Sequence, residues 1–403
     1  MPAAEPAGGR IASLDLIRGV AILGILAVNV EGFAGPMDAT LSPAWNGIPS
    51  MGDEIAFLAT FVLFEGKMRG LLSLLFGASM VLLIESAEAR GQNGDGLQLR
   101  RLIWLAVIGY LHFLLLWWGD ILFAYAFAGF FALMLRHLPV KAMLPLALIA
   151  FAIWHGGGMA GSVPAIEADL RYAAGASPAA EARTLTELRR ADLIEAEAEL
   201  RRERGSGTDL IAYKLAVDPI FPLTGAMFGF GETLPLMLVG MVLYRTGLFT
   251  GGWPRRRITL LAGGGLAVGL PATLALAELA RASGYGMATM NAIIVYWAAL
   301  PHLAMTLGYA AVLVMAAQGA STALHSRIAA IGRMALSNYL GCTLVFTALF
   351  YGWGLGLIGQ VSPLWQVPFV IAGWLAMLAV SPWWQRRFGQ GPVERVWRGL
   401  SGR

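Results

Sequence analysis

The chain has 403 residues, of which 57% are hydrophobic and only 13% are charged, and its mean hydropathy is +0.65. Soluble domains carry about 25% charged residues, so this composition excludes a soluble globular protein and predicts an integral membrane protein. The net charge of +4 comes from basic residues spread among connecting segments, which excludes a nucleic-acid-binding patch. The single cysteine, Cys342, excludes an internal disulfide, and its apolar surroundings indicate a packing role.

The N-terminus has few signal-peptide features, because the apolar run after Arg10 is too long and contains charges. We interpret residues 1–10 as a short cytoplasmic tail before an uncleaved first span. A spanning helix needs about 20 mostly apolar residues, and roughly ten stretches qualify. The predicted spans are 12–34, 54–87, 99–118, 120–137, 139–157, 227–248, 257–280, 286–318, 327–352 and 363–385. The predicted fold is therefore an all-α polytopic membrane bundle of about ten transmembrane helices, forming one integral membrane domain over residues 1–403.

Two of these spans are unusually long, 54–87 and 286–318. Helices of such length are often broken inside the membrane, and Gly66 and Pro301 are the candidate break points.

Basic residues alternate between connecting segments, which predicts the orientation. Every second segment contains Lys or Arg, whereas residues 35–53 and 353–362 contain neither. This pattern fits ten spans with both termini in the cytoplasm. One segment, residues 161–218, is polar and includes a mixed-charge helical stretch with opposite charges three and four residues apart. By alternation it lies outside the cytoplasm, where we expect a solvated helix over the bundle rather than a substrate-binding cap.

Charged and polar residues inside the apolar spans are the most informative feature, because ionisable groups at membrane depth are costly and usually pair or line a substrate path. Spacing and orientation place one basic group toward the cytoplasmic side and mid-depth, and an acidic and imidazole-bearing group toward the outside. The candidate substrate-binding residues are Asp15, Arg18, Asn29, Glu65, Lys67, Arg69, His302, Arg333 and Asn338.

His112 and Asp120 are the candidate catalytic residues. Both fall at the outer end of the hairpin between spans 99–118 and 120–137, where Gly119 permits a tight turn. A carboxylate that holds an imidazole in one tautomer gives the usual form of a general base. His112 lies about two helical turns, roughly 9 to 12 Å, below the reversal. Direct contact therefore requires the second helix to begin low, and water, Asn29 or Glu31 could otherwise bridge the two. We expect the pair to face a polar cavity open to the outside.

Metal and cofactor motifs are missing from the sequence. There is no P-loop, no paired CxxC and no HExxH, and the five histidines lack metal-ligand spacing. We therefore expect no metal and no permanently bound cofactor.

Three long motifs resemble the bacterial YeiB family. They are SLDLIRGVAILGILAVN, FEGKMRGLLSLLFGASM and GYLHFLLLWWGDILFAYAFAG. The end of the chain, with IGRMALSNYL, FYGWGLGL and GPVERVWRGL, resembles the domain of unknown function 418, which we place over residues 227–403. The resemblance covers nearly everything outside 161–218. It implies a multi-pass bacterial inner-membrane protein of unproven activity.

The opening also resembles the transmembrane acyltransferases of the heparan glucosaminide acetyltransferase type and the O-acyltransferases of bacterial surface sugars. The shared LDxxRG pattern comprises Leu14, Asp15, Arg18 and Gly19. That resemblance implies acyl coenzyme A arriving from the cytoplasm and an essential histidine near the outer side. This chain has Asn29 near the place of the O-acyltransferase histidine, so His112 would have to act as the base.

Two functions from different classes follow. The preferred hypothesis is an acyltransferase-like enzyme that moves an acyl group from cytoplasmic acyl coenzyme A to an extracytoplasmic acceptor, either a small molecule or a glycan or lipid. The alternative is a secondary transporter or efflux protein for a small polar or amphipathic solute. The sequence shows no internal repeat, which disfavours a transporter built from inverted halves. A non-catalytic lipid-binding or assembly scaffold is a third interpretation. The expected partners are the lipid bilayer and the acceptor, with a homodimer left open and no nucleic acid.

Overall fold

The computed structural model describes residues 11–320 and 322–402, and all regular elements within those ranges are helical. The predicted all-α class is confirmed, while the expected tail over residues 1–10 lies outside the described residues. The helices are α1 (Ala12–Ala34), η1 (Met37–Thr40), α2 (Met51–Leu63), α3 (Lys67–Glu88), α4 (Gly94–Leu115), α5 (Leu122–Leu135), α6 (Val140–Ala173), α7 (Ala179–Glu203), α8 (Gly207–Val217), α9 (Phe221–Phe228), α10 (Phe230–Arg245), α11 (Arg255–Ala282), α12 (Met287–Ala292), the π-helix η2 (Ile293–Trp297), α13 (Ala299–Gln318), α14 (Ala323–Arg333), α15 (Ala335–Phe350), α16 (Pro363–Phe388) and α17 (Pro392–Leu400).

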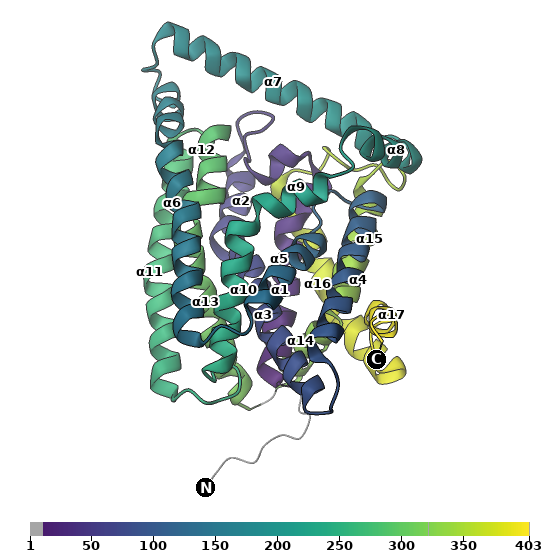
Figure 1. Ribbon diagram of the computed structural model, residues 1–403. Coiled ribbons are helices and arrows are strands. Elements are labelled where there is room, and N and C mark those ends of the chain that lie inside the picture. Colours follow the sequence, from purple (N-terminus) through teal and green to yellow (C-terminus); the bar gives the residue numbers. More distant parts are fainter. Residues whose placement is uncertain (1–10, 321, 403) are drawn as a thin grey trace.

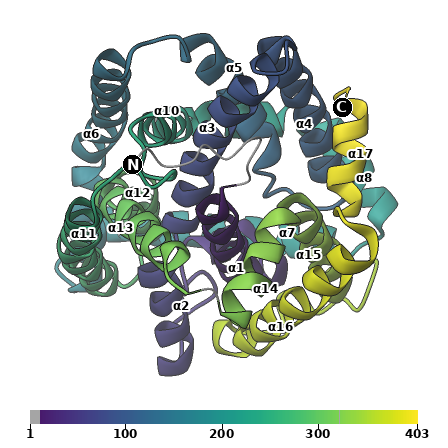
Figure 2. The same ribbon diagram turned by 90° about the horizontal axis from the view of Figure 1, so that it is seen from below.

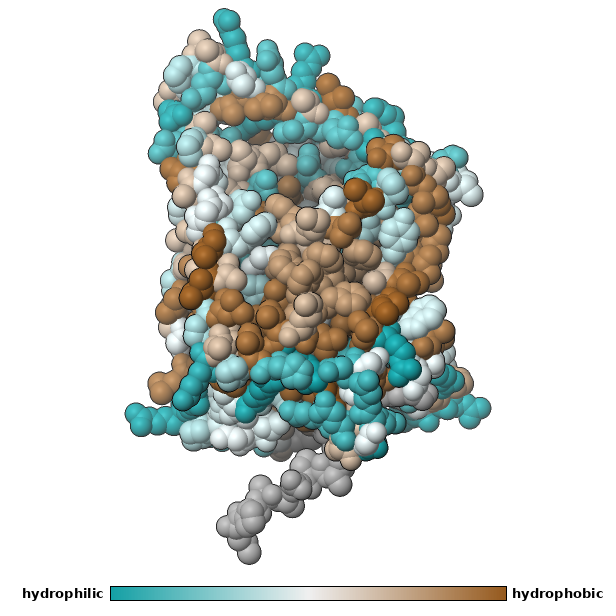
Figure 3. All heavy atoms as spheres, in the orientation of Figure 1, coloured by the Kyte–Doolittle hydropathy of each residue, from teal (hydrophilic) through white to brown (hydrophobic). Residues whose placement is uncertain are grey.

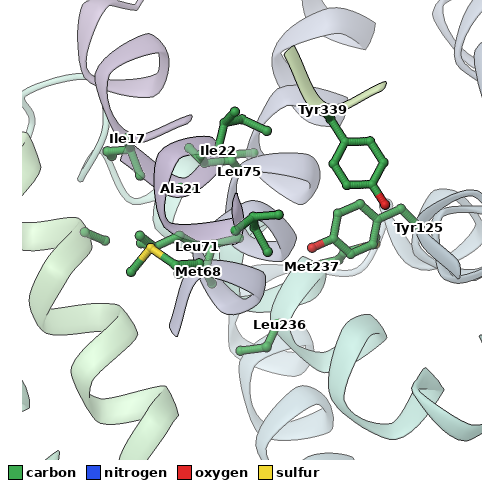
Figure 4. Packing of buried hydrophobic residues seen from close by; sticks show 14 of the residues in the cluster. Ile17, Ala21, Ile22, Met68, Leu71, Leu75, Tyr125, Leu236, Met237 and Tyr339 are labelled. Atoms are coloured by element: carbon green, nitrogen blue, oxygen red, sulfur yellow. The ribbon is translucent and has the colours of Figure 1, made fainter. Parts of the chain in front are cut away.

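Most of the helices run side by side along one axis, and α7 crosses one end of the bundle (Figure 1). Viewed from the opposite end, α1 lies near the centre and other helices surround it (Figure 2). Its Ile17, Ala21 and Ile22 pack against Met68 and Leu71 of α3 in the main hydrophobic core (Figure 4). The polar residues carried by α1 are consequently held inside the bundle.

The surface indicates a membrane protein. A broad apolar belt crosses the middle of the visible face, and hydrophilic residues gather at both ends (Figure 3). Within the described residues, seven helices are long and apolar enough to cross a membrane, or up to nine if each of two bent helix pairs is one span. The predicted ten spans include α5 and α10, which have only 14 and 16 residues. The chain is thus a polytopic helical bundle, and the count of ten remains a prediction.

Both long spans are broken. The first break falls at Gly66, as predicted: this residue precedes α3 with φ +71°, in the left-handed region that glycine tolerates best. A Cβ at Gly66 would lie 2.0 Å from Nδ1 of His302, so the glycine also lets the two segments touch. The second break lies at η2, a few residues before Pro301. Pro301 sits in the first turn of α13, where a missing N–H costs no helical hydrogen bond.

The polar segment 161–218 is also helical. α6 runs without interruption through Ala173, and α7 then crosses the end of the bundle (Figure 1). Arg171 of α6 donates two hydrogen bonds to Glu181 at the start of α7. At the other end, Glu203 accepts a hydrogen bond of 2.8 Å from the Tyr351 hydroxyl. The expected helix over the bundle is therefore present and is held at both ends.

Candidate functional site

The turn between α4 and α5 brings His112 and Asp120 into direct contact. Their Nδ1 and Oδ1 atoms are 2.9 Å apart. α4 ends at Leu115, and the chain then follows a non-helical path to Leu122, where α5 begins. The second carboxylate oxygen of Asp120 accepts a hydrogen bond of 2.7 Å from the Phe123 amide and so caps α5. One carboxylate therefore both starts a helix and orients the imidazole.

Gly109 makes this contact possible on the α4 side. It lies one turn before His112, and a Cβ at this position would be 2.4 Å from the Phe123 amide nitrogen. Because glycine has no Cβ, α5 can begin beside α4 well below the tip of the hairpin. Direct contact between His112 and Asp120 requires α5 to begin this low. Neither Asn29 nor Glu31 is needed to bridge them.

His112 is fully enclosed. Its side chain is 0% exposed, and Nε2 lies 3.0 Å from the Thr343 hydroxyl of α15. The Tyr339 ring packs 5.2 Å from the imidazole, and the Tyr339 hydroxyl donates to the carbonyl of Gly119. When Nδ1–H donates to Asp120, Nε2 is free to accept the Thr343 proton. The expectation that His112 itself faces a cavity is wrong, because Thr343 and Tyr339 lie beside it.

A narrow pocket lies on the far side of Thr343, between α1 and α15. Its free space is about 10 Å³, and its lining includes Asn29, Asn338, Tyr339, Cys342 and Thr343. Cys342 therefore borders this pocket as well as packing. The predicted candidates Asn29 and Asn338 come together here, and Thr343 links them to His112.

Arg69 is the centre of a second polar network. It contacts Glu65 at 3.4 Å and Glu232 of α10 at 3.2 Å. The Tyr125 hydroxyl donates to the Arg69 carbonyl at 2.9 Å, which ties α5 to α3. Glu65 belongs to the break before α3, so this ion pair spans the break rather than lying within one helix. These contacts neutralise the guanidinium inside the bundle.

Lys67 and His302 lie beside the same break. The Lys67 ammonium donates to the Phe61 carbonyl at 2.7 Å, in the last turn of α2. The His302 ring packs edge-on against Phe61 with centroids 5.7 Å apart, and its buried Nε2 lacks a hydrogen-bond partner among the described residues. Both side chains therefore support the broken span, and neither lines the pocket beside Thr343.

The remaining candidates form a third group, toward the end of the bundle at which α1 begins. Arg18 pairs with Asp15 at 3.3 Å and donates to Ser79 of α3 at 2.9 Å. Arg333 donates to the side-chain oxygen of Gln385 at 2.7 Å. A Cβ on Gly332 would lie 1.9 Å from the Asp15 carbonyl oxygen, so the end of α14 lies directly against this part of α1.

The structure thus arranges the predicted residues in three groups, whereas their spacing in the sequence indicated two. The structure adds four partners that the sequence does not mark as members of the site, namely Thr343, Tyr339, Tyr125 and Ser79. Each is a hydroxyl-bearing residue in an apolar helix, which is a weak signal, and serine and threonine hydroxyls in particular often bond to their own helix. Thr343 illustrates this ambiguity, since its hydroxyl is also 3.2 Å from the Tyr339 carbonyl.

Two carboxylates, the half-buried Glu199 and the buried Glu203, lie toward the end of α7. Glu199 accepts hydrogen bonds from the Met37 amide at 3.1 and 3.2 Å. Burial raises the pKa of Glu199 to about 7, despite that hydrogen bond. Burial also raises the pKa of Glu203, and the neighbouring Glu199 adds to the effect. The attachment of α7 therefore depends on carboxylates that prefer to be protonated.

Among residues 11–320 and 322–402, no group of three or more His, Cys, Asp or Glu side chains could hold a metal ion. The chemistry available at the His112 pair is accordingly that of an oriented base, hydroxyls and amides. Together with the apolar belt and long helices, this defines the chain as a multi-pass helical membrane protein with buried polar groups.

The chain belongs to the YeiB-like family. It is 33% identical over 401 residues to "Uncharacterized protein YeiB" of Escherichia coli (strain K12), with 97% of this chain and 96% of that protein covered. It is 29% identical over 403 residues to "Uncharacterized protein YxaH" of Bacillus subtilis (strain 168), with 96% and 93% covered. Residues 243–403 match the family described as "Protein of unknown function (DUF418)". No solved structure matches.

Proposed function

We propose that this protein is a membrane-embedded acyltransferase-like enzyme that transfers an acyl group from cytoplasmic acyl coenzyme A to an extracytoplasmic acceptor. The observation that carries the proposal is the chain of contacts from Asp120 through His112 to Thr343 at the wall of a pocket that also contains Asn29. A carboxylate, an imidazole and a hydroxyl in series are suited to moving a proton to and from a reacting oxygen or nitrogen.

In the proposed reaction, Asp120 holds His112 with Nδ1 protonated, so that Nε2 accepts a proton. A hydroxyl or amine of the acceptor attacks the thioester carbonyl, and its proton passes through the Thr343 hydroxyl to Nε2. The C–S bond then breaks, and the coenzyme A thiolate receives the proton back from His112. Asn29 is placed to donate a hydrogen bond to the oxyanion that forms.

The size of the pocket limits what it can enclose. Pockets that enclose a drug-sized ligand usually measure about 300 to 1,000 Å³, whereas the free space in this one is about 10 Å³, roughly enough for one water molecule. The reacting ends of the two substrates therefore require the helices around the pocket to move apart, and the bulk of coenzyme A and of a glycan or lipid acceptor stays outside it. We assign Arg18 and Arg333 to the cytoplasmic side of this path, where guanidinium groups suit phosphates.

The test is binding followed by activity. Acetyl coenzyme A should raise the thermal unfolding midpoint of the purified full-length protein, because a ligand that binds only the folded state stabilises it. His112→Ala should insert normally and keep that stabilisation but lose acyl transfer. If coenzyme A has no effect and vesicles instead show proton-coupled solute uptake, the enzyme proposal is overturned in favour of transport.

Transport is the second candidate, and one observation favours it. The broken spans at Gly66 and η2 adjoin the charged network of Glu65, Arg69 and Glu232, and discontinuous helices with charged side chains form the ion and substrate sites of many secondary transporters. In this case Glu65 and His302 would be the proton or substrate sites at the breaks, with Asp15 and Asp120 farther along the path.

We also propose that the protein resides in a bacterial inner membrane with both termini in the cytoplasm. The supporting observation is the basic character of every second connecting segment. This orientation places α7, and the attachment of α7 to the bundle, on the extracytoplasmic side.

A further inference from the structure

A second pocket lies on the other side of α1. Its free space is about 10 Å³, roughly the room of one water molecule, and its lining comprises Glu31, Thr40, Phe57, Thr60, Phe61, Glu65 and Ile294. Asn29 and Glu31 are two residues apart and therefore point to different faces of the same helix. The Asn29 pocket and the Glu31 pocket are thus separate sites at one end of α1.

Glu31 has an unusual environment for a carboxylate. The residue is only 7% exposed and lines the second pocket. In the part of the chain that the structure describes, its side chain has neither a hydrogen bond nor an ion pair. Buried charges are normally paired, and an unpaired carboxylate at membrane depth is costly. Such a side chain is neutralised either by a proton or by a cation that binds beside it.

The formal charges around the pocket also leave Glu31 without a positive partner. The carboxylates of Glu31, Glu65 and Glu232 carry three formal negative charges, and Lys67 and Arg69 carry two positive ones. Arg69 bonds to Glu65 and Glu232, while Lys67 bonds to the Phe61 carbonyl. Glu31 is the carboxylate without a cation beside it, so the cluster lacks a single positive charge.

The backbone around the pocket also favours a cation. Glu31 lies in the last turn of α1, where the helix dipole places partial negative charge. Glu65 lies in the break between α2 and α3, and Ile294 belongs to the π-helix η2. Unwound segments of this kind coordinate sodium ions or protons in membrane proteins, and π-helical turns are frequent at functional sites.

We propose that this pocket binds a small monovalent cation, with sodium as the fitting ion, between the carboxylates of Glu31 and Glu65. The threonines that line the pocket contribute hydroxyl groups, so the polar side chains offer oxygen alone, which hard cations prefer. The aromatic side chains of Phe57 and Phe61 exclude water and strengthen the attraction. The site depends on neither acyl transfer nor solute transport.

The test is a comparison of salts on the purified full-length protein. The thermal unfolding midpoint is measured in sodium, potassium and choline chloride at equal ionic strength and pH. We expect sodium to raise the midpoint by on the order of a few degrees over choline, in a saturable manner. Glu31→Gln should abolish the difference and raise the midpoint in choline, because it removes an uncompensated charge.

Two further variants complete the design. Thr60→Val removes a hydroxyl without changing the charge and should weaken the sodium effect, which serves as a test even if Glu31→Gln does not fold. Glu187→Gln makes the same charge change at an exposed position on α7 and should leave the effect intact. Equal midpoints in all three salts would overturn the proposal. Stabilisation by acid without any preference among cations would also overturn it, since a proton alone would then occupy the site.

Discussion

Gly109 and Asp120 lie against each other where α4 and α5 approach: a Cβ on Gly109 would be 2.7 Å from Oδ2 of Asp120. That oxygen also caps α5, while the other oxygen of the carboxylate holds His112. The orientation of His112, the candidate base, therefore depends on the absence of a side chain at Gly109, one turn earlier in the same helix.

Gly109→Ala should separate α4 from α5. The added methyl group would force the Phe123 backbone and the Asp120 carboxylate away, and such overpacking costs about 1 to 3 kcal/mol. We expect a lower unfolding midpoint together with loss of acyl transfer. Gly156→Ala in α6 is the matched control, because nothing lies within 4 Å of a Cβ there and its midpoint should not fall. Equal behaviour of the two variants would contradict this account of the hairpin.

Thr343 variants test whether the hydroxyl relays the proton. Thr343→Val keeps the shape and removes the hydroxyl, so Nε2 of His112 loses its connection to the pocket. General acid–base catalysis contributes typically about 10²- to 10⁴-fold, and we expect the acyl-transfer rate of this variant to fall within that range. Thr343→Ser should retain most of the rate. The rates are compared under single-turnover conditions, and a fully active Thr343→Val would show that the threonine only packs.

The attachment of α7 should weaken as the pH rises. Glu199 has a pKa of about 7 when α7 is attached, above its ordinary value of 4.5, so the attached state binds more protons than the detached state. Its contribution is fully present below the ordinary pKa and is lost as the pH rises through about 7. Glu203 shifts in the same direction, whereas Lys214 and Arg202 oppose the shift of Glu203.

Hydrogen exchange of the α7 amides, corrected for intrinsic rates, measures this change. Protection in the half of α7 that contains Glu199 should fall between about pH 5 and about pH 8. Glu199→Gln should remove the part of the pH dependence of protection that lies near neutrality, and Glu187→Gln should leave the pH dependence unchanged. Protection that is constant over this range in the wild-type protein would disprove the role of these carboxylates.

Topology can be tested with two fusions. A reporter that is active only outside the cytoplasm should be active when fused after Ser177, between α6 and α7, and inactive when fused after Arg256, in the first turn of α11. The prediction follows from the alternation of basic segments. Activity at both positions, or at Arg256 alone, would require a different orientation.

The class of the protein can be predicted from its amino-acid sequence. Hydropathy and charge content alone predict an all-α membrane bundle, because a bilayer requires each span to satisfy its own backbone hydrogen bonds. The break at Gly66 was also predictable, since glycine was the obvious interruption in an overlong span. The hairpin between α4 and α5 followed from Gly119 and the proximity of two apolar stretches.

Which polar residues meet depends on how the helices pack. Thr343 lies 231 residues from His112, and Glu232 lies 163 residues from Arg69, so no local spacing could relate them. The unpartnered state of Glu31 is likewise a property of the surrounding helices. Periodicity gives the face of a helix on which a residue lies, but the packing of α1 against its neighbours determines what that face contacts. Because this packing cannot be read from spacing, the predicted residues separate into three groups that the sequence did not indicate.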